Sequence, residues 1–323
     1  MSIRKLQKSV INLKEKNNVT ILAHYYQNIE IQEIADYLGD SLGLSQIAHQ
    51  KATTRYIIFA GVVFMAETAS ILNQDKHILV PERQACCPLA DFLTPTIIKK
   101  FKQEYPSLPV VTYVNTTAAA KAESDVCCTS SNSINIVKKI KEEFEVTKIL
   151  FGPDNNLAEY VAQNSGVEIV KIPGEGHCYV HSHLTLENIK GSQAAHPQAK
   201  VLVHPECIKE VREYADFVGS TAGMYNFVKE NRDIYEEYII GTEKGLLSRL
   251  SVDFPNNRFY LPSEKLVCMD MKKNELQNIK AILKHLDAED YDKLKQFEIK
   301  VPADIAERAL RPIKKMLEYS KKS

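Results

Sequence analysis

The 323-residue sequence carries no excess of either charge, because 41 Lys and Arg residues balance 41 Asp and Glu residues. A nucleic-acid-binding surface is strongly basic, so this balance argues against such a partner. Long apolar runs are also missing, since the longest, 56–66, is too short to cross a bilayer. The segment 1–18 lacks the apolar core of a signal peptide and shows one amphipathic face instead. We therefore expect a cytoplasmic protein without a membrane or nucleic-acid partner.

Paired-cysteine motifs are absent as well. None of the seven cysteines shows the CxxC spacing of a zinc ribbon or the tight run of a ferredoxin. Disulfides are not expected in a reducing compartment. Three of the cysteines, Cys87, Cys178 and Cys268, are nevertheless spaced 91 and 90 residues apart. Such even spacing over a long range indicates an internal repeat.

Further landmarks recur with the same period. Strand-like runs place His24, Tyr113 and His204 at one position of the repeat, 89 and 91 residues apart. A hydroxyl residue follows each of them by 17 residues, and a strand that ends in glycine follows by 37 to 39 residues. The hydroxyl residues are Ser41, Ser130 and Thr221, and the glycines are Gly61, Gly152 and Gly241. The chain is therefore predicted to contain three copies of one unit.

Each copy shows the pattern β–α–β–α–β–α–β, which predicts a small parallel sheet with helices on both faces. At about 150 residues per domain, the length alone suggests two domains or several small units in one body. The repeat favours an α/β fold of three homologous units, arranged with pseudo-threefold symmetry around a central active site. We expect the first unit to span 1–88 with 269–323, the second 89–178 and the third 179–268. The terminal segments are predicted to be helical and to pack around the first unit.

Three cysteines that meet on one axis would suit a [4Fe–4S] cluster whose fourth iron has no protein ligand. The alternative metal is zinc, bound by Cys178 together with nearby histidines. Those histidines are His177, His181 and His183. The other four cysteines have no counterparts in all three units, so we expect them to be structural. They are Cys86, Cys127, Cys128 and Cys207.

Polar residues gather at the predicted strand ends. A Ser or Thr in a strand-to-helix turn is usually an N-cap, so we expect Ser41, Ser130 and Thr221 to cap their helices. A helix start also binds anions, so three such starts in one cavity would suit a substrate with carboxylates or phosphate. The sequence shows no Walker or GxGxxG motif for a nucleotide. The candidates for proton transfer are His24, Tyr26, Tyr113, Asn115, His204 and Glu206.

Taken together, these motifs resemble the quinolinate synthase family over nearly the whole chain. The segments that carry the resemblance are AHYYQ (23–27), GDSL (39–42), YVNT (113–116), VCCTSSN (126–132), GHCYVH (176–181), HPEC (204–207), GST (219–221) and GTEKGL (241–246). The resemblance implies a [4Fe–4S] enzyme that condenses iminoaspartate with dihydroxyacetone phosphate. The products are quinolinate, phosphate and water, and quinolinate supplies the pyridine ring of NAD. It also implies a functional link to an enzyme that produces iminoaspartate.

The resemblance further implies a role for individual residues. The cluster ligands fall on Cys87, Cys178 and Cys268. The catalytic positions fall on Tyr26, Tyr113, His204 and Glu206. The substrate-binding positions fall on His24, Ser41, Tyr113, Val114, Asn115, Ser130, His204, Pro205, Glu206 and Thr221.

The sequence departs from the family pattern in places. The family has Gly before its first Cys-Pro pair, whereas this chain has Cys86, so both Cys86 and Cys87 are possible ligands and Cys87 is preferred. The segments after Thr221 and around Cys268 also differ from the commoner family forms. Three other classes stay open: a different hydro-lyase with an open cluster, a redox or electron-transfer protein, and a structural protein without metal.

Overall fold

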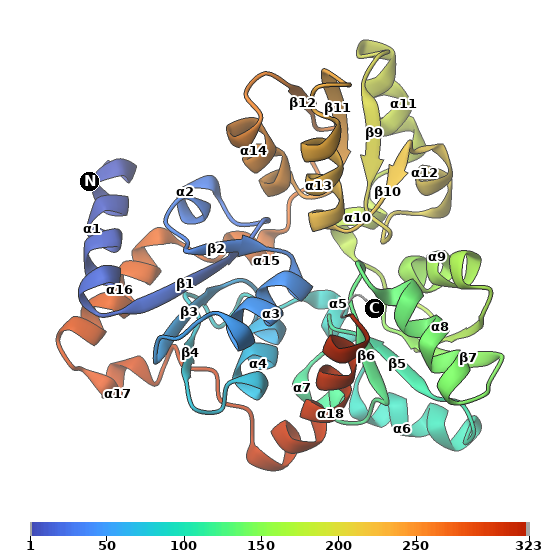
Figure 1. Ribbon diagram of the computed structural model, residues 1–323, viewed down its shortest axis with the longest axis horizontal. Coiled ribbons are helices and arrows are strands. Elements are labelled where there is room, and N and C mark those ends of the chain that lie inside the picture. Colours follow the sequence, from blue (N-terminus) through green and yellow to red (C-terminus); the bar gives the residue numbers. More distant parts are fainter. Residues whose placement is uncertain (1, 321–323) are drawn as a thin grey trace.

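Three parallel sheets of four strands each make up the framework of the molecule (Figure 1). A computed structural model describes residues 2–320. The first sheet contains β1 (Val19–His24), β2 (Tyr37–Gly39), β3 (Tyr56–Ala60) and β4 (His77–Leu79). The second contains β5 (Val110–Tyr113), β6 (Val126–Cys128), β7 (Lys148–Gly152) and β8 (Glu168–Lys171). The third contains β9 (Lys200–Val203), β10 (Phe217–Val218), β11 (Glu237–Gly241) and β12 (Arg258–Tyr260).

The three sheets share one strand order, in which the first strand of each unit lies between the second and the third. All strand pairs are parallel, with His24 opposite Gly39 and Ala23 opposite Ala60 in the first sheet. Every residue of β1 is buried, as expected for a parallel strand covered on both faces. The predicted α/β fold of three similar units is confirmed. Because the strands are parallel, their carboxyl ends lie at one edge of each sheet.

Helices connect the strands in the same order in each unit. The first unit has α2 (Ile29–Gln32), α3 (Ser41–Gln50) and α4 (Val63–Leu72). The second has α7 (Ala118–Lys121), α8 (Ser133–Glu143) and α9 (Asn155–Ser165). The third has α12 (Lys209–Tyr214), α13 (Thr221–Asn231) and α14 (Lys244–Asp253). The C-cap of α9 is Gly166, whose φ of 68° is left-handed and therefore suits glycine.

A short and then a longer helix follow the last strand of each unit. The short ones are α5 (Pro88–Asp91), α10 (Tyr179–Ser182) and α15 (Met269–Lys272), and the longer ones are α6 (Pro95–Glu104), α11 (Leu186–Ala195) and α16 (Leu276–Asp287). Ile98 of α6 packs on the second sheet and Ile189 of α11 on the third. Ile279 of α16 packs on the first sheet. The first unit therefore receives its last helix from the far end of the chain.

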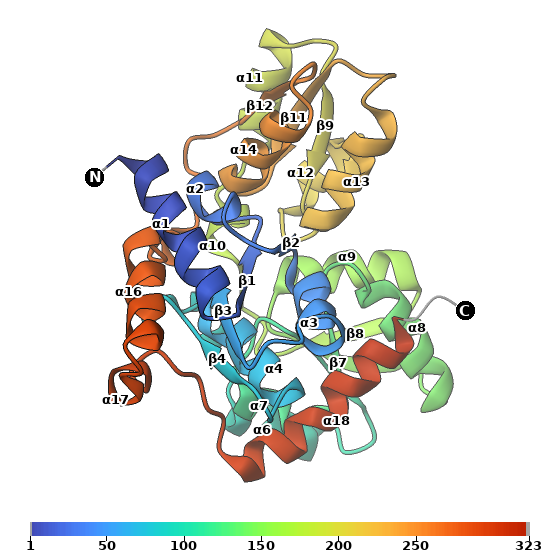
Figure 2. The ribbon, with the colours of Figure 1, turned by 60° about the vertical axis from the view of Figure 1, so that its left-hand side comes forward.

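The remaining helices are α1 (Ile3–Lys16), α17 (Tyr291–Leu294) and α18 (Ala303–Tyr319). Helix α1 lies along α16, beside the first sheet (Figure 2). Helix α18 instead packs against α4 of the first unit and against α7, α8 and β6 of the second. Helix α16 therefore packs on the first unit as expected, whereas α18 lies between the first and second units. The domain boundaries themselves stay a prediction.

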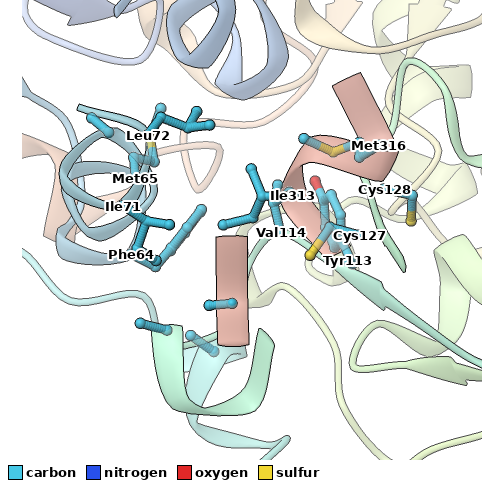
Figure 3. Close-up of a cluster of buried hydrophobic side chains, with 14 of the residues drawn as sticks. Phe64, Met65, Ile71, Leu72, Tyr113, Val114, Cys127, Cys128, Ile313 and Met316 are labelled. Carbon is cyan, nitrogen blue, oxygen red and sulfur yellow. The ribbon is translucent and has the colours of Figure 1, made fainter. Parts of the chain in front are cut away.

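The contact that α18 makes between the first two units is mainly apolar. Ile313 and Met316 of α18 lie between the side chains of α4, such as Phe64 and Leu72, and the second sheet around Cys127 (Figure 3). Burying such side chains contributes about 1.5–3 kcal/mol each. Within residues 2–320, no helix is both long and apolar enough to span a bilayer.

Candidate active site

The carboxyl ends of the three sheets surround one central cavity, which encloses about 640 Å³ of empty space including its open mouth. Most of the predicted site residues line this cavity, and they come from all three units. They are His24, Tyr26, Ser41, Cys87, Tyr113, Asn115, Ser130, Cys178, His204, Glu206, Thr221 and Cys268. Val62, Phe64, Val180 and Met271 also line it, and no sequence pattern pointed to these apolar side chains.

Two predicted substrate-binding residues are not among the lining residues. Val114 is 3% exposed and packs in the core between the first two units. Pro205 directs its carbonyl oxygen to Arg212, 3.3 Å away, instead of to the cavity. Both are neighbours in sequence of residues that do line the cavity, Asn115 and Glu206. A strand-end segment alternates its side chains between opposite sides, so a run of predicted positions cannot all face one cavity.

Cys87, Cys178 and Cys268 each occupy the same place, the N-cap of a four-residue helix. Burial raises the pKa of all three thiols, that of Cys268 to about 11. Nearby backbone N–H groups of the following turn partly offset this effect. Cys86 is exposed, and its thiol contacts the carbonyl oxygen of Arg83. The structure therefore places Cys87, and not Cys86, at the cavity.

The alternative zinc site is not assembled. His177 and His183 are exposed, whereas His181 is 2% exposed and lies close to Cys178. Cys178, His181 and Glu206 offer ligand atoms within 4.8 Å of one another. Both ring nitrogens of His181 already have partners, however: Nδ1 is 2.7 Å from Glu206 and Nε2 is 2.8 Å from the Thr242 hydroxyl. A zinc ion there would have to break one of these contacts.

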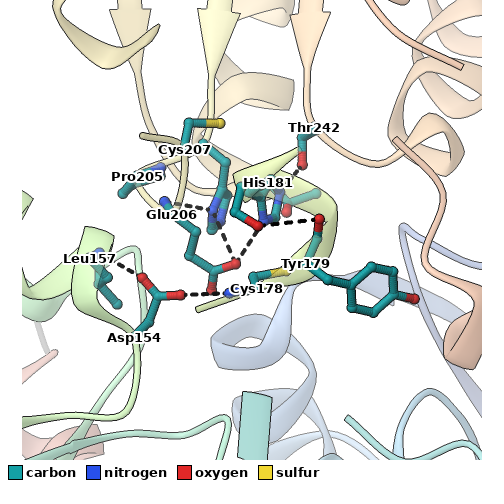
Figure 4. A network of polar contacts seen from close by, with 12 residues as sticks. Asp154, Leu157, Cys178, Tyr179, His181, Pro205, Glu206, Cys207 and Thr242 are labelled. Carbon is teal, nitrogen blue, oxygen red and sulfur yellow. Dashed lines mark hydrogen bonds and ion pairs between the residues drawn. The ribbon is translucent and has the colours of Figure 1, made fainter. Parts of the chain in front are cut away.

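These contacts belong to a chain of hydrogen bonds that crosses the cavity wall (Figure 4). The Thr221 hydroxyl donates to the Tyr26 hydroxyl at 2.9 Å, and the latter lies 2.7 Å from the Thr242 hydroxyl. One direction of donation gives every donor in this chain an acceptor. Tyr26 donates to Thr242, Thr242 donates to Nε2 of His181, and Nδ1–H of His181 donates to ionised Glu206. Tyr26 and Glu206 are therefore two points on one connected chain.

Glu206 is 2% exposed, yet it is held ionised. Burial alone would raise its pKa, but His204 and the hydrogen bond from His181 outweigh burial and lower the pKa to about 2. Its Oε2 accepts from His181, while its Oε1 has no partner among the described residues. The amide oxygen of Asn115, from the equivalent position of the second unit, is likewise buried and without a partner there. Unpartnered buried acceptors in one cavity indicate a place for a ligand.

His24 and His204 are neutral and fixed in one tautomer. Burial, above all, lowers the pKa of each imidazole to about 3. The backbone N–H of Tyr26 donates to Nδ1 of His24 at 3.1 Å, and that of Glu206 donates to Nδ1 of His204 at 3.3 Å. Because Nδ1 accepts in both rings, the proton resides on Nε2. Each ring therefore offers one N–H donor, and the rings of His204 and His181 stack at 4.3 Å.

The expected N-cap roles of the hydroxyl residues are wrong. The N-caps are Asp40, Asn132 and Ser220, and Ser41 and Thr221 are the first residues of α3 and α13. Asp40 accepts from the backbone of Gly43, and Ser220 accepts from that of Gly223. In the first and third units the N-cap therefore lies one residue before the predicted hydroxyl residue, and in the second unit it lies two residues after it. This leaves the hydroxyls of Ser41 and Ser130 available to the cavity, while that of Thr221 donates to Tyr26.

The three units also meet directly beside these helix starts. Ser131 donates to Oδ2 of Asp40 at 2.9 Å and to the Ser220 hydroxyl at 2.9 Å, while Ser220 lies 3.3 Å from the same Oδ2. One residue from each unit thus takes part in a single polar contact. The predicted repeat pointed to the neighbouring hydroxyls and missed this contact.

Two buried carboxylates hold the cysteine loops in place. Asp154 accepts from the backbone N–H of Leu157 at 2.7 Å and from that of Cys178 at 3.0 Å (Figure 4). Glu243 accepts from the backbone N–H of Cys268 at 3.3 Å and pairs with Lys272 at 2.9 Å. Both residues are the N-caps of the helices that follow the third strand of their units, α9 and α14. In the first unit the N-cap at this place is Val62, before α4. Comparing residues just after the strand-ending glycines could have found them.

A family model described as quinolinate synthetase A protein matches residues 8–318. The chain belongs to this family. A protein named quinolinate synthase from Pyrococcus furiosus is 43% identical over 318 residues, covering 98% of this chain and 99% of its own. One of the same name from Thermotoga maritima is 43% identical over 309 residues, covering 96% and 98%.

The quinolinate synthetase A family is catalytic, so the chain is an enzyme. Its members' names place its function in the biosynthesis of NAD. The match includes all three units and the segments that carry every cavity residue. Membership also implies a metal or iron–sulfur cofactor, for which the three cavity cysteines are the candidate ligands.

Proposed function

We propose that the enzyme condenses iminoaspartate with dihydroxyacetone phosphate to give quinolinate, phosphate and two waters. The main support is that one cavity collects three thiols, the neutral imidazoles of His24 and His204, the ionised carboxylate of Glu206 and three hydroxyls from equivalent positions of three units. We also propose a cytoplasmic location, where thiols stay reduced. The reaction then needs an enzyme in the same compartment that supplies iminoaspartate.

Cys87, Cys178 and Cys268 would hold a [4Fe–4S] cluster. The donor set fits this group, because three thiols of equivalent position line one cavity, and nearby backbone N–H groups favour the thiolate form of each. The condensation has no net redox change, so the cluster would supply a Lewis-acidic iron without a protein ligand. Asp154 and Glu243 would keep two of the three ligand loops in position.

In this proposal the cavity binds anionic substrates, although no lysine or arginine of residues 2–320 lines it. Helices α3 and α13 begin at it, and their free N–H groups together with the hydroxyl of Ser41 can bind carboxylate or phosphate. His24 and His204 add one N–H donor each. Neutral donors let the product leave more easily than fixed cations would, because they bind anions less tightly.

Glu206 acts as the base in this proposal. Glu206 lines the cavity and its Oε1 has no partner among the described residues, so it can accept a carbon-bound proton, while Oε2 stays hydrogen-bonded to His181. Tyr26 is held in its protonated form, because burial raises the pKa of its hydroxyl well above the usual value. It therefore serves as a proton donor, and the chain through Thr242 and His181 connects it to Glu206.

The decisive experiment is turnover without oxygen. Protein prepared anaerobically is incubated with iminoaspartate and dihydroxyacetone phosphate, and quinolinate and phosphate are quantified. We expect one phosphate per quinolinate, with neither product when one substrate is omitted. Iron-loaded, folded protein that forms no quinolinate under these conditions would contradict the proposal and leave a different hydro-lyase reaction as the alternative.

A further inference from the structure

Three buried residues of unlike chemistry occupy one equivalent position outside the cavity. Gln32, Lys121 and Arg212 each lie eight residues after His24, Tyr113 and His204, respectively. Their exposed fractions are 2%, 0% and 6%, although Lys and Arg are seldom buried. They do not line the cavity. We call them the clamp residues.

Arg212 donates hydrogen bonds to the backbone on both sides of Glu206. Its Nη1 donates to the carbonyl oxygen of Pro205 at 3.3 Å and to that of Cys207 at 2.7 Å. These two peptide groups flank the carboxylate residue in sequence (Figure 4). The guanidinium thus fixes the loop that carries Glu206 without touching the carboxylate or the cavity.

Gln32 makes the same contacts in the first unit. Its Nε2 donates to the carbonyl oxygens of Tyr25 at 2.8 Å and Gln27 at 2.9 Å, which flank Tyr26. In the second unit, Lys121 donates to the carbonyl oxygen of Thr116, which follows Asn115. Each clamp residue therefore holds the strand-end loop that carries a cavity side chain.

Each clamp residue also reaches the second residue of a helix in the neighbouring unit. Arg212 donates to the carbonyl oxygen of Asn156 in α9 at 2.9 Å, and Gln32 donates to that of Gly245 in α14 at 3.0 Å. The ammonium group of Lys121 lies over the ring of Phe64 in α4, 5.3 Å from its centre. The loops are thus fixed to the adjacent unit as well as to their own.

We propose that Arg212 is a positioning residue for Glu206 and that Gln32 has the same role for Tyr26. The two loops carry the groups to which the proposed function assigns proton transfer, and the present inference rests on that function. A displacement of about 1 Å at such a group can cost about a hundredfold in rate. Loss of a clamp should therefore lower kcat, even though no cavity group has changed.

The test compares Arg212→Met with Gln32→Met, and its first readout does not depend on turnover. Hydrogen exchange is followed at two protected loop amides: Cys207 N–H, which donates to His204 O at 3.0 Å, and Gln27 N–H, which donates to His24 O at 3.0 Å. We expect Arg212→Met to accelerate exchange at Cys207 alone and Gln32→Met to accelerate it at Gln27 alone. In both variants kcat should fall about tenfold or more, with KM and iron content nearly unchanged.

Matched controls separate positioning from general destabilisation. Glu159→Gln removes the ion-pair partner of Arg212, which lies 2.9 Å away, but leaves the contacts with the loop. Lys200→Met removes another cation of the third unit, paired with Asp216 at the opposite end of β9. Both should keep wild-type kcat and loop exchange. Arg212→Lys keeps a cationic donor and should restore most of the turnover.

The outcomes are distinct from those that test the function. If wild-type protein forms no quinolinate, the proposed function fails, while the exchange pattern still decides whether the clamps hold their loops. Unchanged exchange and kcat in both methionine variants would overturn the inference, as would equal losses in Lys200→Met. If Arg212→Met does not fold, Gln32→Met, which removes no charge, carries the same test.

Discussion

At the scale of single residues, Glu206 combines a buried position with an ionised carboxylate. One oxygen is bound to His181 and the other has no partner among the described residues. A base with one fixed and one free oxygen keeps its orientation while it accepts a proton. The equivalent residues in the other units, Tyr26 and Asn115, are a donor and an amide, so the same position serves three different chemical roles.

Replacing Glu206 by Gln should lower kcat by about a hundredfold or more, because glutamine keeps the size and hydrogen bonding but cannot accept the proton. Quinolinate formation is measured in single turnover, and iron per chain is measured in the same preparation. The iron content should stay at the wild-type value, since no cysteine contact changes. Turnover near the wild-type rate would remove Glu206 from the mechanism and leave the tyrosines as the bases to test.

Thr242 provides the matching control, because it touches the chain between Tyr26 and His181 but not Glu206 itself. Thr242→Val keeps the shape and removes the hydroxyl, so it should cut the connection and lower kcat by about tenfold. Thr242→Ser restores a hydroxyl and should restore most of the rate. Equal rates in the valine and serine variants would show that the connection carries no proton.

At the scale of elements, the short helices after each last strand explain how distant cysteines come together. Each of these helices begins directly after a cysteine, and in two units a carboxylate at the start of a longer helix accepts from the backbone of that cysteine. The first unit has Val62 in place of the carboxylate. The Cys87 loop therefore lacks the carboxylate contact that holds the backbone of the other two cysteines.

Cys87→Ser, Cys178→Ser and Cys268→Ser should each lose most of the bound iron and nearly all turnover, since serine is a poor ligand for iron–sulfur clusters. Cys86→Ser should keep both, because its side chain is exposed outside the cavity. Iron and sulfide are quantified in anaerobic preparations of all four variants. Loss of iron in Cys86→Ser with retention in Cys87→Ser would show that the ligand is the earlier cysteine.

The sequence was sufficient to predict the elements that repeat with their chemistry intact. Strands that end in His, Tyr or Gly and loops that end in Cys keep their residue types, so their period is visible. The N-caps were assigned wrongly because Asp40 and Ser41, like Ser220 and Thr221, are both capping residue types, and spacing cannot choose between neighbours. The clamp residues could not be found by comparing the three units, because the same position of the repeat holds three different residue types, Gln, Lys and Arg.

At the scale of the whole molecule, three equivalent interfaces close the ring of units around the cavity. The clamp residues cross all three of them, and the contact among Asp40, Ser131 and Ser220 joins the units beside the cavity. Helix α18 covers the interface of the first two units with apolar side chains. The third unit lacks such a cover among the described helices, so its two interfaces depend more on polar contacts.

Closure of the ring buries His24 of the first unit and His204 of the third, and this makes the stability of the whole molecule depend on pH. In the folded protein the pKa of each imidazole is lowered to about 3, whereas in an unfolded chain it returns to about 6.5. Between these values the unfolded chain binds more protons, so the free energy of unfolding falls as the pH falls below about 6.5. Glu206 adds nothing above pH 5, because it is ionised in both states there.

From pH 7 to pH 5.5 these two histidines should therefore lower the free energy of unfolding by about 2.5 kcal/mol, at up to about 1.4 kcal/mol per pH unit for each group below its unfolded pKa. Urea unfolding of the wild-type protein and of His24→Gln/His204→Gln, both prepared without oxygen, measures this loss. The other titrating groups are common to both proteins and largely cancel in the difference. The double variant should lose about 2.5 kcal/mol less than the wild type over the same pH range. An equal loss in the two proteins would mean that both imidazoles take up protons in the folded state, and their assignment as neutral N–H donors to the substrate would then be wrong.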